Sequence, residues 1–172
     1  MGDTLITVIA IFSAAILMFV FPLMSVSERN DDISQLAVQT ATAEFVDQIA
    51  TVGYISETNY NNYIQKLGAT GNTYDVTIEV QILDENPNKL TTTSTDLIGE
   101  NARYSVYTNS ILEKVNSSGK YVLKQGDNVI VTAKNTNKTM AKLLEDFMYK
   151  VTNKDTYQVA ASASAMVVNS GN

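Results

Sequence analysis

The hydrophobic pattern of this chain is strongest at its N-terminal end. Residues 4–27 form an uncharged run, TLITVIAIFSAAILMFVFPLMSVS. As a helix rising about 1.5 Å per residue, this run is roughly 36 Å long, enough to cross the hydrocarbon core of a bilayer. The pattern therefore predicts a hydrophobic helix over residues 1–30, covered by lipid, by a bundle of identical helices, or by each in turn.

From Asp31 onward the run gives way to an amphipathic pattern, which predicts that the helix continues as a stalk. Apolar or small residues recur there at spacings of three and four, the period of one helix face. They are Ile33, Leu36, Ala37, Thr40, Ala41, Phe45, Ile49 and Val52. Polar residues fall elsewhere on the helical wheel, at Ser34, Gln35, Gln39, Asp47 and Thr51. We expect the apolar stripe to pack against a globular domain.

Three positions are predicted to shape this long helix. Pro22 lacks a backbone donor, which predicts a bend or an unwound turn near residues 19–22. Asn30 or Asp31 is suited to cap the amphipathic part, and Gly53 to end it.

The remainder predicts a small α+β domain. Tyr74, Val76, Ile78, Val80 and Ile82 alternate with polar residues, the signature of a strand with one buried face. Further strands are predicted at residues 121–123 and 129–133 and in the closing segment TYQVAASASAMVVNS, which should lie tightly against a helix.

Short helices are predicted over residues 56–67, 104–115 and 139–149. The last is expected to turn inward Met140, Leu143, Leu144, Phe147 and Met148. The predicted fold is thus a long N-terminal helix, kinked near Pro22, whose second half packs on a three- or four-stranded sheet with short helices. Residues 31–172 would form the stalk and this head domain.

Composition narrows the function. The chain has no cysteine and no histidine, which excludes disulfides, thiolate catalysis and the usual general base and zinc ligands. A net charge of -6 would repel a nucleic-acid backbone. Asp84, Glu85 and Asn86 match no EF-hand spacing, and a solvated turn before Pro87 is the favoured interpretation. We therefore predict neither an enzyme nor a catalytic, cofactor or metal site.

The charges are divided unevenly along the chain. Up to Asn86, the bases Arg29 and Lys66 stand against eleven acids, whereas ten bases and seven acids follow. This leaves about -9 on the first half and about +3 on the second. Either the solvated faces simply differ in charge, or unlike surfaces of neighbouring copies attract one another and build an open helical assembly.

The segment up to Val52 resembles a mature type IV pilin. The matching features are Met1 in the place of the first residue after leader removal, the uncharged run, Pro22 and the amphipathic continuation. The resemblance implies a helix that anchors the subunit in the membrane and later forms the core of a filament. The segments GYIS and ATGNTYD, at residues 53–56 and 69–75, are similar to those of Gram-positive tight-adherence-type pilus systems.

The chain departs from this family at its fifth position, where an acidic residue is replaced by Leu5 and the nearest acid is Asp3. In the family that acid is expected to neutralise the terminal amine of a neighbour, because burying either charge alone is costly. The resemblance implies that Asp3 takes this role from two positions earlier.

These observations favour a structural subunit of an extracellular, cell-surface filament, polymerised through its N-terminal helix from a membrane-anchored precursor. The expected partners are copies of itself, the membrane before assembly, and the pilus assembly machinery. Candidate interface residues are Asp3, Leu5, Ile9, Ala10, Phe12, Ala14, Leu17, Phe21 and Pro22. The alternatives are a membrane-anchored minor pseudopilin or accessory component of a pilus or secretion machine, and a tethered ligand-binding domain.

Overall fold

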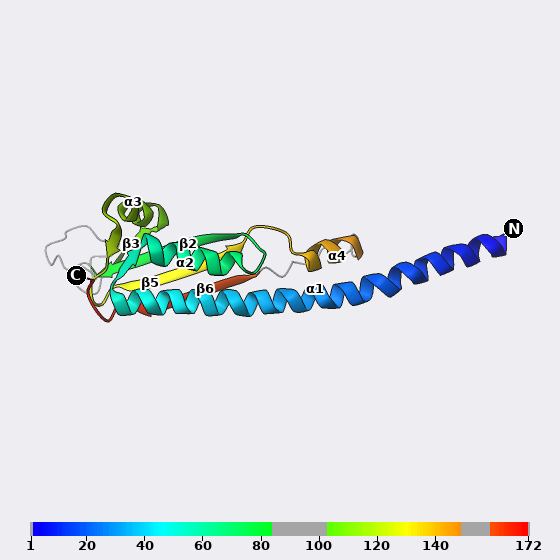
Figure 1. Ribbon diagram of the computed structural model, residues 1–172, viewed down its shortest axis with the longest axis horizontal. Helices are drawn as coiled ribbons and strands as arrows, with labels where there is room; N and C mark the ends of the chain where they lie inside the picture. Colours follow the sequence, from blue (N-terminus) through cyan, green and yellow to red (C-terminus); the bar gives the residue numbers. More distant parts are fainter. Residues whose placement is uncertain (1, 84–102, 149–158, 172) are drawn as a thin grey trace, which may run out of the picture.

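One uninterrupted helix organises the chain (Figure 1). The computed structural model describes residues 2–83, 103–148 and 159–171. Helix α1 runs over Gly2–Val52, 51 residues, with Pro22 inside it. Its C-terminal half carries the domain and its N-terminal half extends beyond the domain along a gentle bend (Figure 1). Of the predicted bend or unwound turn near Pro22, the unwound turn does not occur, because the helix continues through Pro22. The predicted helix cap at Asn30 or Asp31 is wrong, because the helix continues there as well.

The remaining elements form an α+β domain, as predicted. A four-stranded antiparallel sheet has the order β3-β2-β5-β6, and a second sheet pairs β1 with β4. The strands are β1 Tyr54–Ser56, β2 Tyr74–Leu83, β3 Arg103–Tyr107, β4 Lys120–Val122, β5 Asn128–Asn135 and β6 Ala160–Met166. The short helices are α2 Glu57–Gly68, α3 Thr108–Ser118 and α4 Met140–Met148.

Most predicted elements are confirmed, but the helix expected over residues 104–115 is partly wrong. Residues 103–107 form strand β3, in which Tyr104 pairs with Ile82 and Val106 with Val80. The helix begins only at Thr108, whose side chain accepts a hydrogen bond from the backbone N–H of Ile78 at 2.7 Å. Pairing with β2 therefore overrides the local helical pattern.

The core lies between α1, α2 and one face of the sheet. Val38, Phe45 and Ile49 of α1 are fully or almost fully buried in one cluster with the inward side chains of β2 and β5. Phe45 stacks on Tyr63 of α2 with ring centroids 4.3 Å apart. The hydroxyls of Tyr63 and Thr42 lie 3.0 Å apart, so both buried polar groups are satisfied.

Only part of the predicted apolar stripe of α1 is buried. Ala41, Phe45 and Ile49 lie in the core, but Ile33 and Leu36 remain 62% and 65% exposed. Toward the domain the helix instead turns Ser34, Val38, Thr42, Val46 and Ala50. The reason lies in β6, whose inward positions are Ala161, Ala163 and Ala165. These small side chains let α1 approach the sheet closely. The small residues of α1 that face the domain fit this close contact.

Two further predictions concern α4 and the segments outside the described residues. The side chains of Met140 and Leu143 are 60% and 49% exposed, so their predicted inward orientation is wrong, while Leu144 is half-buried. The side chains of Phe147 and Met148 lie outside the described part, as do residues 84–86 and the first residues of the predicted closing segment.

The C-terminal end of α1 is closed by the end of the chain. Gly53 has a φ of +75° and donates to the carbonyl of Ile49, ending the helix as predicted. Beside it, the N–H of Val168 donates to the carbonyl of Ala50 at 2.9 Å, and the Asn169 side chain donates to that of Thr51 at 3.0 Å. Carbonyls without a partner inside the helix are thereby satisfied.

This closure predicts that Gly53 cannot carry a side chain. A Cβ there would lie 2.1 Å from the carbonyl oxygen of Asn169, so Gly53→Ala should lower the free energy of unfolding by about 3 kcal/mol or more. Gly71→Ala is the matched control, because Gly71 has a similar φ of +78° in open space and should lose only about 1 kcal/mol. Denaturant titration of the full-length protein in detergent, followed by tyrosine fluorescence, measures both. If both variants lost the same free energy of unfolding, the close contact between Gly53 and Asn169 would not be important for stability.

Candidate functional site

The N-terminal half of α1 is a long uncovered surface. Every residue from Gly2 to Phe19 is exposed, including Phe12 at 69% and Phe19 at 77%. By length and composition this helix is long and apolar enough to cross a membrane. Exposed apolar surface of this extent marks a site of contact with lipid or protein.

All the interface residues predicted from the sequence lie on this surface, but they do not form one face. Asp3, Ala10, Ala14, Leu17 and Phe21 follow one another at helical spacing, and we call them the N-terminal stripe. Leu5, Ile9 and Phe12 lie on the opposite side of the helix, and Pro22 lies outside both groups. The helix therefore offers two apolar faces, which suits contact with more than one neighbour.

A second uncovered surface continues along α1 beside the domain. Ile33, Leu36, Ala37 and Thr40, together with Arg29, lie on the side of the helix that faces away from the sheet, and we call them the outer stripe. A shallow groove of about 490 Å³ follows this stripe and also touches Ala69. It ends at an ion pair between Lys66 of α2 and Glu44 of α1, with Nζ and Oε2 2.6 Å apart. The sequence pattern contained this stripe but assigned it to the core.

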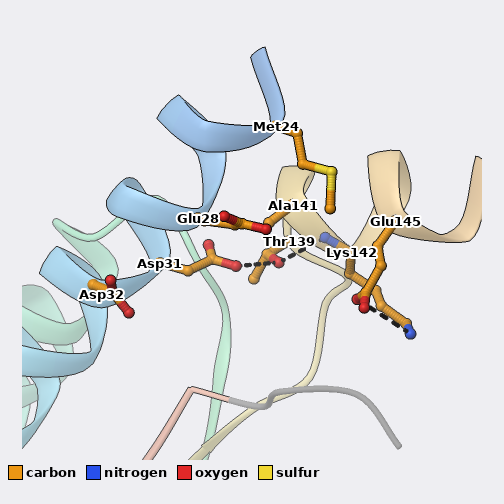
Figure 2. Close-up of a pocket in the computed structure, with 8 residues that line it drawn as sticks. All are labelled: Met24, Glu28, Asp31, Asp32, Thr139, Ala141, Lys142 and Glu145. Carbon is orange, nitrogen blue, oxygen red and sulfur yellow. Dashed lines mark hydrogen bonds and ion pairs between the residues drawn. The ribbon is translucent and has the colours of Figure 1, made fainter. Parts of the chain in front are cut away.

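Between α1 and α4 lies a polar groove of about 320 Å³ (Figure 2). Its centre is a buried contact, in which the Thr139 hydroxyl donates to Oδ2 of Asp31 at 2.6 Å. The Thr139 oxygen in turn accepts from the backbone N–H of Lys142 at 3.3 Å and so caps the first turn of α4. Since Asp31 and Thr139 are both buried, this contact joins α4 to α1. No local sequence signal links two residues so far apart in the chain.

Charged side chains line this groove, and those of α4 pair with one another. Glu28, Asp31 and Asp32 line it from α1, and Lys142 reaches Glu145 at 3.9 Å (Figure 2). Lys142 also pairs with Asp146 at 3.1 Å. Hydrogen bonds from Lys138 and Lys142 hold the pKa of the exposed Asp146 carboxyl below its usual value. Among the residues that the structure describes, no group of three or more acidic, histidine or cysteine side chains is placed to hold a metal ion.

Other shifted groups belong to packing networks in the domain. Burial raises the pKa of Tyr63, against the opposing effect of its hydrogen bond with Thr42. Hydrogen bonds from Ser105 and Gln81 lower the pKa of Glu79 on the sheet. Neither arrangement places a nucleophile beside a base.

The protein is an α+β domain packed on one long helix, whose N-terminal half is apolar and exposed. Comparison with known protein families, with curated proteins and with solved structures finds no match to this chain.

The joint between α1 and α4 leads to a prediction. Asp31→Ala leaves the buried Thr139 hydroxyl without its acceptor, so it should cost about 1.5–3 kcal/mol and speed amide exchange in α4 about tenfold. Asp32→Ala removes an exposed acid of the same groove and should change stability by less than about 0.5 kcal/mol. Hydrogen–deuterium exchange of the full-length protein in detergent checks both variants. If α4 exchanged at the same rate in the Asp31 and Asp32 variants, the contact between Asp31 and Thr139 would not be what holds α4 on α1.

Proposed function

We propose that this protein is a structural subunit of an extracellular, type IV pilin-like filament that polymerises through α1. The observation that carries the proposal is the extent of uncovered apolar surface on α1. It reaches from the N-terminal run past the domain boundary to Thr40.

Lipid alone does not account for this surface. A hydrocarbon core is about 30 Å thick, whereas residues 4–40 of a helix extend over roughly 54 Å. Glu28, Arg29, Asp31 and Asp32 also interrupt the apolar surface, and charged side chains are costly within a bilayer. The outer stripe beyond them would lie outside the membrane, where only protein can cover it. Helices of neighbouring copies would cover both stretches at once.

A second candidate is a membrane-anchored minor or accessory component of a pilus or secretion machine. The observation in its favour is that the run of residues 4–27 alone has the length of a bilayer core. Such a component would remain mainly in the membrane and be scarce in any fibre. Its abundance relative to the main fibre protein separates the two candidates.

The proposal predicts fibres that contain this chain. Shearing the cells that make it, followed by electron microscopy and immunolabelling of the released material, should detect labelled fibres. Labelling along the whole fibre supports a major subunit, and labelling at an end supports an accessory role. If the protein stays in the membrane fraction and no labelled fibre is released, the proposal fails.

Asp3 is predicted to matter for assembly rather than for insertion. Asp3→Ala leaves the cation that pairs with Asp3 in the helix bundle buried without a partner, so filament yield should fall about tenfold. Membrane insertion should be unchanged or easier, because a charged residue near the lipid is lost. Glu113→Ala, which removes an exposed acid of α3 away from α1, is the control and should leave yield unchanged. Equal yields of the Asp3 variant and the parent chain would remove Asp3 from the interface.

A further inference from the structure

The outer stripe has the properties of a seat for another helix. Its apolar members are exposed and point away from the sheet, and Arg29 begins the stripe at its N-terminal end. Arg29 forms no ion pair within the described parts of the chain. The nearby acids Glu28, Asp31 and Asp32 all line the groove beside α4, and Arg29 does not. This cation is therefore directed to the uncovered side of α1.

The N-terminal stripe has complementary properties. Asp3 begins it, and no other charged residue occurs before Glu28. Ala10 and Ala14 follow at helical spacing, and such small side chains let a second helix approach closely. One stripe thus begins with a carboxylate and continues with small residues. The other begins with a guanidinium and continues with Ile33 and Leu36.

We propose that the outer stripe of one copy receives the N-terminal stripe of a second copy, with the Asp3 carboxylate paired to the Arg29 guanidinium. The inference rests on the proposed filament and specifies its helix register. The two helices lie parallel and are offset by about 26 residues, or roughly 39 Å. Ala10 then faces Leu36 and Ala14 faces Thr40, so that small side chains meet larger ones.

The parallel direction follows from the geometry of the two stripes. If the second helix ran antiparallel with Asp3 at Arg29, its apolar run would lie along residues 5–28 and leave the outer stripe uncovered. In the parallel arrangement the same pair covers the outer stripe and directs every domain toward the same end. A carboxylate and a guanidinium can form two parallel hydrogen bonds, which fixes the register more firmly than apolar contact does.

Charge reversal tests the pair in the full-length chain. Asp3→Arg alone and Arg29→Asp alone should each lower the yield of sheared filaments about tenfold or more, while membrane content is measured in parallel. Combining the two reversals should restore the yield to within about threefold of the parent chain. Asp3→Arg combined with Lys114→Asp is the control, because Lys114 is an exposed cation of α3 away from both stripes and should not rescue.

Disulfide trapping tests the register directly, because the parent chain has no cysteine. A chain carrying Ala10→Cys and Leu36→Cys should give a ladder of linked copies when filaments are oxidised. The two positions lie roughly 39 Å apart along one helix, so any link must join two copies. The control, Phe12→Cys with Leu36→Cys, places one thiol on the opposite face and should give no ladder.

The outcomes separate this inference from the proposed function. Filaments that form without the expected ladder, or with an equal ladder in the control, overturn the register. Failure of the double reversal to rescue overturns the Asp3–Arg29 pair. In these cases the filament proposal stands. If the parent chain makes no filaments, the proposed function and this inference fall together.

Discussion

The packing of α1 against β6 is the contact on which the rest of the structure depends. It joins the first element of the chain to the last strand, and the inward alanines of β6 let the helix approach the sheet closely. The Gln35 side chain strengthens this joint, since it donates to the carbonyl of Ala160 at 2.6 Å and accepts from its N–H at 3.0 Å. The end of the chain then satisfies the last carbonyls of α1. The direction in which the helix leaves the domain is thereby set.

The same contact determines which parts of α1 stay uncovered. By turning Val38 and Phe45 toward the sheet, it turns Ile33 and Leu36 away from it. Burying one large apolar side chain is worth about 1.5–3 kcal/mol. The exposed residues of α1 therefore represent a large free energy that the isolated domain does not use. The orientation of α1 on the sheet thus decides both which residues pack in the domain and which stay exposed for assembly.

Sequence patterns predict the elements here better than the contacts between them. Alternation identifies β2, and Ser56 is recognisable as the cap of α2, where its Oγ accepts from the N–H of Asn59 at 3.2 Å. The periodicity of α1 gives the spacing of its apolar residues but not which side the sheet will cover, since that depends on β6. Likewise, β3 depends on pairing with β2, and the contact of Asp31 with Thr139 depends on the folded chain. The exposure of α1 is therefore the part of the candidate site that sequence anticipates, whereas its division into two stripes requires the structure.

In the proposed filament, hydrophobicity alone would not draw α1 out of the membrane. Lipid tails are about as apolar as leucine, so residues 4–27 gain little when neighbouring helices replace lipid around them. The free energy that favours the filament over the membrane therefore has to come from groups that lipid does not stabilise. Asp3, at the end of the apolar run, has no fixed cation beside it at the membrane surface, and the outer stripe lies beyond the bilayer in water. When one copy binds another, Asp3 would gain Arg29 as a partner, and Ile33 and Leu36 would be covered in the same step. The driving force for assembly would thus lie at the two ends of the apolar run, and the run itself would supply reach and close packing.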